Sequence, residues 1–217
     1  MIIVINYMLK KLLCAVLAPL TYCYNFDLCV VGATSGLGNE LIYRSINEKN
    51  ANVLALSSSP NSIIYEPFRG HGFNECSTNE FKNKNFVVDS YWKHITHTYD
   101  NIVFCTSAKP FQKDYSDKLL DKYLNLLPEN CKNVALVSAY GVGDSIENAN
   151  LGIQVMDSLY LKDVYRAKNY QEKALNNYQS DVNKLIYRPK ALSYGKTLLD
   201  STSRYDLAGR ILEDLNM

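Results

Sequence analysis

The sequence predicts an α/β domain in which a parallel β-sheet is covered by helices on both faces. Short apolar runs, typical of strands buried on both sides, alternate along the chain with longer segments of helical period. Strands joined by helices pair in parallel through right-handed crossovers. The chain has 217 residues, 47% of them hydrophobic. We therefore expect one doubly wound domain with a single large core.

Six apolar runs are the predicted strands. In chain order they are DLCVVGA (27–33), ANVLALSS (51–58), KNFVVDSYW (84–92), DNIVFCTSA (100–108), KNVALVSAYG (132–141) and VNKLIYRP (182–189). The least regular part of the chain, about residues 57–85, falls between the second and third runs. We expect it to form a long surface connection.

Four segments, 37–49, 115–130, 161–178 and 204–215, have apolar residues at helical spacing and are the predicted helices. In the first, the inward stripe is Leu37, Leu41, Ile42 and Ile46. In the third, the expected inward side is Val164, Ala167, Gln171, Ala174 and Tyr178. Ser203 is the predicted N-cap of the last helix. The expected inward residues of that helix are Leu207, Ala208, Ile211, Leu212 and Leu215.

Residues 1–25 are predicted to be a hydrophobic leader outside the domain, which spans 26–217. Lys10 and Lys11 precede a short apolar stretch, and the small residues Thr21 and Cys23 follow it. This pattern is typical of a signal peptide and is too short for a confident membrane span. The alternative is an extension that packs on the domain or anchors it loosely. A signal implies secretory or organelle entry; otherwise the protein is cytoplasmic, and any membrane contact is through the leader.

Charge and cysteine usage exclude several classes of function. The chain has 23 basic and 22 acidic residues, so no electrostatic argument favours a nucleic-acid partner. None of its six cysteines forms a CxxC pair or stands near a histidine at ligand spacing. We interpret them as small buried hydrophobic residues and predict no metal site.

A glycine-rich turn, VVGATSGLGNEL (30–41), joins the first strand to the first helix. Gly32 permits the tight turn, Gly36 leaves room for a pyrophosphate, and Gly38 allows close helix packing. Free N–H groups at the helix start favour phosphate binding. In this strand–turn–helix context the turn predicts a dinucleotide site, which also includes the intervening Thr34, Ser35 and Leu37.

The end of the second strand indicates which dinucleotide is bound. NAD sites usually place a carboxylate there, but this strand ends in Ser57 and Ser58. Small hydroxyls tolerate a 2′-phosphate, so NADP is preferred and NAD is the alternative. Arg44 and Arg69 are the nearest arginines, and both are interpreted as ordinary surface charges.

Six strings in order resemble the atypical short-chain dehydrogenase/reductase proteins, specifically their NmrA-like, NAD(P)H-binding group. They are VVGATSGLGNEL, NIVFCTSA, VALVSAYGVGD, YRAKNYQEKAL, LIYRPKAL and SRYDLAGRILEDL. The resemblance runs from about Asp27 to Leu215. It implies a Rossmann fold in which the dinucleotide lies across the carboxyl ends of the strands.

The resemblance also implies roles for residues at those strand ends. Asp89 would lie near the adenine, and Thr106, Ser107 and Ala108 would line the cofactor. Ser138 would be the active-site serine and Lys168 the ribose-binding lysine. Arg188 and Pro189 would lie beside the nicotinamide pocket. From the residues alone, Lys168 has a second interpretation, a solvated helix lysine paired with Glu172 four residues later.

One departure from the family pattern concerns the proton donor. Active members of the wider superfamily carry a tyrosine four residues before the lysine, but Val164 stands there. Tyr165 is one residue away, which turns its side chain by about 100° around the helix. Tyr165 and Tyr140 are the remaining candidate donors. The alternative is that both tyrosines pack or face solvent.

Two functions follow from these observations. The first is an NAD(P)-dependent oxidoreductase acting on a small organic substrate. The second, favoured by Val164, is a non-catalytic NADP(H)-binding sensor or assembly factor. A nucleotide-sugar epimerase is a weaker third interpretation, because that chemistry normally retains the tyrosine and little chain follows the sixth strand. The sequence assigns neither a substrate nor an oligomeric state.

Overall fold

The computed structural model describes residues 25–58, 86–90, 97–106, 116–148, 162–193 and 201–217. Several predictions concern the other residues. Residues 1–24 of the predicted leader lie outside the described residues, as do the candidate cofactor contacts Ser107 and Ala108. Arg69 is also outside them.

Six strands form one parallel sheet, in the order β3-β2-β1-β4-β5-β6. The strands are β1 (Asn25–Val31), β2 (Val53–Ser57), β3 (Phe86–Ser90), β4 (Thr98–Phe104), β5 (Asn133–Val137) and β6 (Asn183–Tyr187). All six fall within the predicted apolar runs or, for β1 and β4, begin two residues earlier. The chain leaves β1 toward β2 on one side and returns to β4 on the other. In such sheets, ligands bind at this reversal of strand order, at the carboxyl ends.

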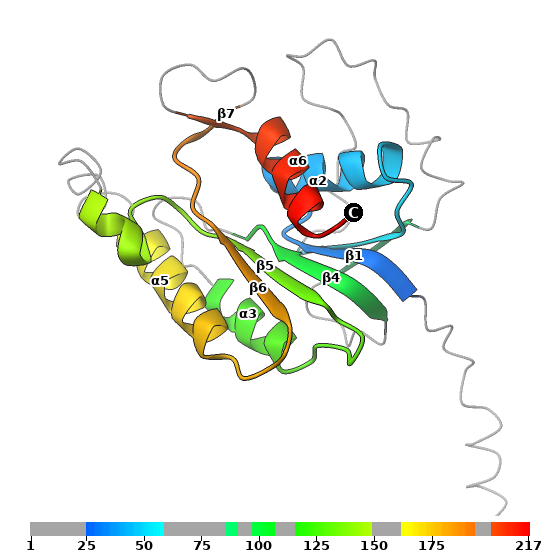
Figure 1. Ribbon diagram of the computed structural model, residues 1–217, viewed down its shortest axis with the longest axis horizontal. Helices are drawn as coiled ribbons and strands as arrows, with labels where there is room; N and C mark the ends of the chain where they lie inside the picture. The colour runs from blue at the N-terminus through cyan, green and yellow to red at the C-terminus, as the bar shows by residue number, and fades with distance from the viewer. Residues whose placement is uncertain (1–24, 59–85, 91–96, 107–115, 149–161, 194–200) are drawn as a thin grey trace, which may run out of the picture.

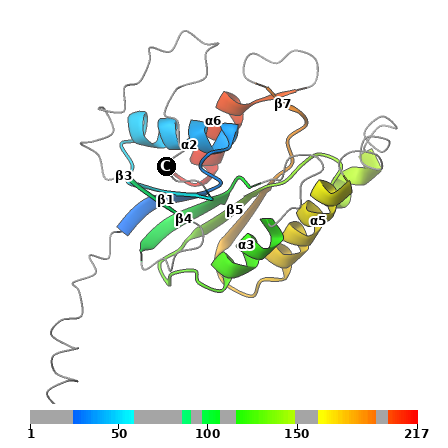
Figure 2. The ribbon, with the colours of Figure 1, turned by 180° about the vertical axis from the view of Figure 1, so that it is seen from behind.

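Helices cover both faces of the sheet, which confirms the doubly wound α/β prediction. Helices α2 (Gly36–Asn47) and α6 (Arg204–Asp214) pack side by side on one face, and α3 (Ser116–Leu124) and α5 (Lys162–Asn177) lie on the other (Figures 1 and 2). A 3-10 helix, η3 (Gly143–Asn148), follows β5. A small parallel pair that the sequence does not predict, β7 (Leu192–Ser193) and β8 (Thr202–Ser203), precedes α6.

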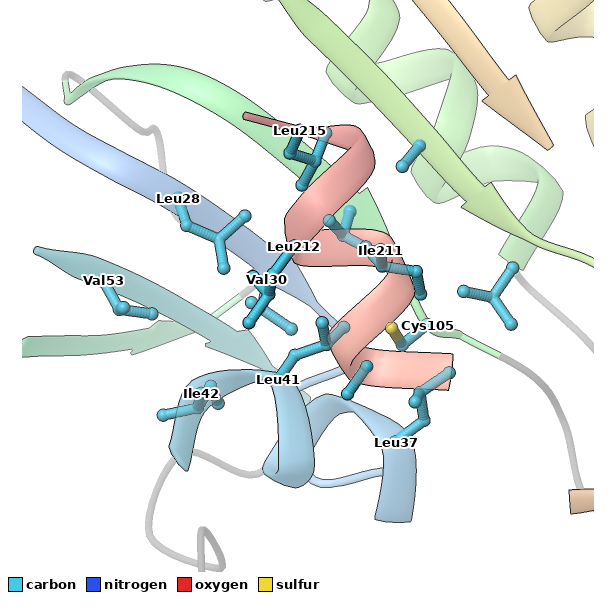
Figure 3. Packing of buried hydrophobic residues seen from close by; sticks show 14 of the residues in the cluster. Leu28, Val30, Leu37, Leu41, Ile42, Val53, Cys105, Ile211, Leu212 and Leu215 are labelled. Carbon is cyan, nitrogen blue, oxygen red and sulfur yellow. The ribbon is translucent and has the colours of Figure 1, made fainter. Parts of the chain in front are cut away.

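The core has two layers, because successive side chains of each strand point to opposite faces. Leu28 and Val30 of β1 belong to the layer beneath α2 and α6, whereas Cys29 and Val31 belong to the layer beneath α3 and α5. Figure 3 shows the first layer, in which Leu41 of α2, Leu212 of α6 and Val30 of β1 meet. The predicted inward residues of α2 and α6 are all buried. Ser203 caps α6 as predicted, with its hydroxyl accepting from Asp206 N.

The buried face of α5 overlaps the predicted one but is shifted around the helix. Of the five residues expected to face inward, Ala167 and Gln171 are buried, and Val164, Ala174 and Tyr178 are half-buried. The buried stripe is Ala167, Lys168, Gln171, Glu172 and Leu175. The helix is therefore turned so that two charged side chains enter the protein. They do so because both find partners there, which apolar periodicity does not detect.

Candidate functional site

The carboxyl ends of the central strands bring the predicted site residues to one edge of the sheet. The glycine-rich turn follows β1, Thr106 follows β4, Ser138 follows β5, and Pro189 follows β6. The ends of β1 and β4 touch directly, since Cys105 N donates to Val31 O at 2.7 Å. The turn and the candidate cofactor residue Thr106 are therefore neighbours at the point where the strand order reverses.

Gly32 and Gly38 have the conformational roles that the sequence predicts. Gly32 has a φ of +95°, and a Cβ there would lie 2.8 Å from the carbonyl carbon of Cys105. A Cβ on Gly38 would collide with the carbonyl oxygen of Gly32. Both positions therefore exclude larger side chains, for backbone geometry in the first case and for close helix packing in the second.

The start of α2 leaves two backbone N–H groups available. The Ser35 hydroxyl accepts from Gly38 N at 2.9 Å, and Ser35 O accepts from Asn39 N at 2.9 Å. The N–H groups of Gly36 and Leu37 have no partner within the helix, as expected at a helix start. The Leu37 side chain is buried in the core, so only its backbone is offered. Ser35 serves as the cap, and these two N–H groups are the candidate phosphate contacts.

Among the described residues at the end of β2, Ser58 is exposed. Ser57 is buried, and its hydroxyl donates to Thr34 Oγ1 at 3.4 Å, so it joins the strand end to the turn. Asp89 lies in β3, in register with Leu56.

The interpretation of Arg44 as an ordinary surface charge is wrong. Its Nη1 donates to Tyr205 O at 2.7 Å, and its guanidinium lies 4.1 Å from the centre of the Tyr205 ring. Arg44 also pairs with Glu48 at 2.7 Å. This arginine therefore holds α2 against α6.

Lys168 is buried, with 3% of its surface exposed. Its Nζ donates to the carbonyl oxygens of Thr106 at 2.5 Å and Val137 at 2.8 Å. The interpretation of Lys168 as a solvated surface lysine is therefore wrong. The ammonium instead bridges the ends of β4 and β5, at the edge where the family resemblance expects it.

The hydroxyls of Thr106 and Ser138 are buried and have no hydrogen-bond partner among the described residues. Buried polar groups in proteins nearly always have partners, and leaving one unpaired costs about 1–3 kcal/mol. Both residues flank the carbonyl groups that Lys168 binds, since Ser138 directly follows Val137. These hydroxyls fit a polar ligand such as the ribose and amide of a nicotinamide dinucleotide.

Cys105 lies beneath this edge, between the glycine-rich turn and Lys168. Burial raises the pKa of its thiol to about 12, an effect that the positive charge of Lys168 partly offsets. Figure 3 shows the side chain within the apolar layer near Leu37. The thiol is thus a neutral core group at physiological pH, as the sequence predicts.

The side chain of one candidate tyrosine, Tyr165, contacts the backbone of the other, Tyr140. The Tyr165 hydroxyl donates to the Tyr140 carbonyl oxygen at 3.0 Å, and Tyr140 N donates to Pro189 O at 2.9 Å. Lys190 Nζ lies 5.6 Å from the centre of the Tyr140 ring. The slip of one residue from the usual tyrosine position thus carries Tyr165 to the loop that follows Ser138. Tyr140 ties the same loop to the end of β6.

Glu172 and Arg188 form an ion pair that the sequence reasoning missed. Arg188 Nε and Nη2 donate to the two carboxylate oxygens of Glu172 at 3.0 and 2.7 Å. This bond is the main reason that the pKa of Arg188 is raised. The sequence signal for this pair was the four-residue spacing between Lys168 and Glu172, which places these two side chains on one face of α5.

In the described part of the chain, no three His, Cys, Asp or Glu side chains are grouped so as to hold a metal ion. Among the same residues, none of the helices has the length and apolar character needed to span a membrane.

Comparison with known proteins gives structural matches only. No protein-family model matches the sequence, and no curated protein matches it. The anaerobillin reductase ChuY from Escherichia coli O157:H7 is 14% identical, with 89% of this chain and 91% of that chain covered and a TM-score of 0.56. A putative NAD-dependent epimerase/dehydratase from Bacillus halodurans is 16% identical, with 88% of each chain covered and a TM-score of 0.58.

A third similar structure was solved with a cofactor. It is a short-chain dehydrogenase/reductase from Veillonella parvula in complex with NADP, 11% identical over 88% of each chain, with a TM-score of 0.60. Matches at these identities establish the fold. The chain has the Rossmann fold, which is the fold that its resemblance to the short-chain dehydrogenase/reductase group implies.

Proposed function

We propose that the protein is an NAD(P)-binding oxidoreductase of the atypical, NmrA-like short-chain dehydrogenase/reductase type, acting on a small organic substrate. The observation that carries this proposal is the pair of unpartnered hydroxyls, Thr106 and Ser138, beside the buried Lys168. Together with the glycine-rich turn they offer contacts to both halves of a dinucleotide. The similar structures named above supply further support, since they include proteins of this fold described as reductases and dehydrogenases.

Each part of the edge has a role in holding the dinucleotide. The N–H groups of Gly36 and Leu37 would bind the pyrophosphate at the start of α2. Lys168, Thr106 and Ser138 would bind the ribose and nicotinamide half. The cofactor supplies the hydride chemistry, while the protein supplies position and electrostatics. The positive charge of Lys168 favours any developing negative charge near Ser138.

NADP is the proposed cofactor, with NAD as the alternative. In β2 and the residue after it, the described strand end offers the exposed hydroxyl of Ser58 and no carboxylate. A carboxylate there would repel a 2′-phosphate, whereas a hydroxyl can donate a hydrogen bond to its oxygens. Arg44 is engaged with α6, so it is not a candidate partner for the 2′-phosphate.

A specific observation favours a second function, a non-catalytic NADP(H)-binding sensor or assembly factor. Val164 occupies the usual tyrosine position. The Tyr165 hydroxyl already donates a hydrogen bond to the Tyr140 carbonyl oxygen. A phenol engaged in this way must break that bond before it can protonate a substrate. Proton donation by Tyr165 therefore requires it to exchange partners, whereas binding of the dinucleotide does not.

The first experiment separates the two functions. Purified protein is mixed with NADPH in a stopped-flow spectrometer, and absorbance of the reduced nicotinamide is followed with a panel of carbonyl compounds and quinones. Oxidation that is lost in Lys168→Met supports the oxidoreductase. Tight binding without oxidation of the cofactor supports the sensor.

The second experiment tests the binding site itself. We expect Gly36→Val to abolish dinucleotide binding in calorimetric titrations, because the side chain fills the space next to the phosphate contacts. The domain should stay folded, because valine has a higher helix propensity than the glycine that it replaces. Unchanged affinity in a folded Gly36→Val variant would refute the assignment of the turn.

A further inference from the structure

The Glu172–Arg188 pair joins three elements around Lys168. Glu172 lies on α5, one helical turn after Lys168, and Arg188 follows the end of β6. Glu172 is 3% exposed, and the Arg188 side chain is 28% exposed. A contact at two points fixes the orientation of the two groups as well as their distance.

The third element is the loop after β5, which lies directly on the pair. Gly143 has a φ of +57°, and a Cβ there would come within 2.5 Å of Glu172 Oε2 and 3.1 Å of Arg188 Nη2. Gly143 N also donates to Asn169 Oδ1 of α5 at 3.0 Å. The loop that carries Ser138 and Tyr140 is thus placed by contact with the pair and with the helix residue next to Lys168.

Polar side chains make up most of the buried stripe of α5. Lys168, Gln171 and Glu172 are buried beside Ala167 and Leu175, while Ala174 and Tyr178 pack half-buried against the core. Apolar packing therefore contributes to the rotation of α5, but the polar contacts of the stripe must fix it. A rotation by one residue, about 100°, would carry Lys168 out of the site. Because residues four apart share one helix face, whatever holds Glu172 also holds Lys168.

We propose that the Glu172–Arg188 pair is a positioning device that sets the rotation of α5 and thereby holds the Lys168 ammonium between the ends of β4 and β5. Glu172 and Arg188 act through Lys168 and need not touch the dinucleotide. The effect of the pair on binding rests on the proposed function. Its effect on the position of Lys168 does not.

The first test therefore needs no dinucleotide. The ¹⁵N-ammonium NMR signal of Lys168, assigned with Lys168→Met, should exchange slowly with solvent in the wild type, because the group is buried and bound to two carbonyls. We expect Glu172→Gln and Arg188→Lys to lose this signal to exchange. Arg188→Lys keeps the charge and loses the two-point geometry. A signal that is absent in the wild type, or unchanged in the folded variants, would overturn the proposal.

Two further variants control this test. Asp163→Asn removes an exposed ion pair with Arg166 on the same helix, and the signal should persist in it. If single substitutions prevent folding, Glu172→Gln/Arg188→Met removes both charges and leaves neither buried and unpaired. This double variant should fold and still lose the slowly exchanging signal.

The second test is a double-mutant cycle on NADPH affinity. Glu172→Gln should weaken binding roughly tenfold when Lys168 is present, and should have little further effect in a Lys168→Met background. Equal losses in both backgrounds would mean that the pair does not act through Lys168, and would overturn the proposal. Absence of NADPH binding by the wild type would refute the proposed function. The role of the pair in positioning Lys168 would then be tested by the ammonium signal alone.

Discussion

Two glycines of the glycine-rich turn have different roles, one in folding and one in the proposed dinucleotide binding. Gly32 is required by the backbone, since its φ is +95° and Cys105 leaves no room for a Cβ. Gly36 is the first residue of α2, where the helix offers its unpaired N–H groups. Two glycines four residues apart are therefore expected to fail in different ways when replaced.

We predict that Gly32→Ala destabilises the domain by at least about 2 kcal/mol, because alanine is strained at positive φ and its methyl group meets the backbone of Cys105 and Thr106, just after β4. Urea unfolding followed by circular dichroism measures the change. Gly36→Ala is the matched control and should stay within about 0.5 kcal/mol of the wild type. Equal stability of the two variants would contradict the turn geometry.

Cys105 predicts an alkaline loss of stability. Its thiol ordinarily has a pKa near 9.0, and burial raises the pKa in the folded protein to about 12. The unfolded chain therefore loses this proton first, so stability is full below about pH 9 and falls as the pH rises toward 12. At a pH of about 10.5 the thiol should account for about 2 kcal/mol of the loss.

Urea unfolding of wild type and Cys105→Ala at about pH 7.5 and about pH 10.5 measures this effect, and the variant should show the smaller fall. Cys131→Ala should show a similar reduction, since burial raises the pKa of that thiol to about 11 and the two thiols lose nearly the same stability at a pH of about 10.5. A pH dependence that is identical in wild type and Cys105→Ala would contradict the prediction.

At the scale of elements, side-chain hydrogen bonds cross the sheet at the amino edge. Asn133 Nδ2 donates to Asn101 Oδ1 at 2.6 Å, and Asn133 Oδ1 accepts from Asn183 Nδ2 at 3.0 Å. Asn101 in turn donates to Asp27 O at 2.8 Å. This amide ladder joins β1, β4, β5 and β6, and it satisfies polar groups that the sheet would otherwise bury without partners.

We predict that Asn133→Ala destabilises the domain by about 2 kcal/mol, because it leaves the buried Asn101 oxygen without its donor. Chemical denaturation measures the loss. The control is Asn130→Ala, an exposed amide at the same edge, which should cost less than about 0.5 kcal/mol. If the two variants are equally stable, the ladder does not contribute as proposed.

At the scale of the whole molecule, the amino ends and the carboxyl ends of the parallel strands carry different groups. The amide ladder crosses the amino edge, while the glycine-rich turn, Lys168 and the Thr106 and Ser138 hydroxyls share the carboxyl edge. The α2–α6 layer and the α3–α5 layer hold this arrangement from both faces (Figures 1 and 2). A ligand bound at the carboxyl edge contacts residues from several strands and is therefore expected to stabilise the entire domain.

We predict that NADPH at a hundred times its Kd raises the free energy of unfolding by about 2.7 kcal/mol, by mass action on the folded state. Chemical denaturation with and without ligand measures the gain. NADH at the same concentration should give a smaller gain if NADP is the preferred cofactor, and Gly36→Val should show none. The absence of any gain from saturating NADPH or NADH would contradict dinucleotide binding.

The sequence by itself determined the features that depend on neighbouring residues. The six apolar runs became the six strands of the sheet, the apolar stripes of α2 and α6 became buried faces, and Ser203 became a cap. The roles of Gly32 and Gly38 in the glycine-rich turn were also predictable, because both residues act within one short segment. Each of these depends on hydrophobic period, capping or turn chemistry, which are local properties.

The tertiary structure alone decided where the charged residues of α5 lie. Lys168 meets carbonyl groups of Thr106 and Val137, and Glu172 meets Arg188, all at positions outside the helix. Burial of these charges is favourable only because those distant partners exist, so the periodicity of α5 predicted part of the inward face but not its two charged residues. Contacts between residues far apart in the chain are set by the packing of strands and helices, and this packing assembled the candidate site.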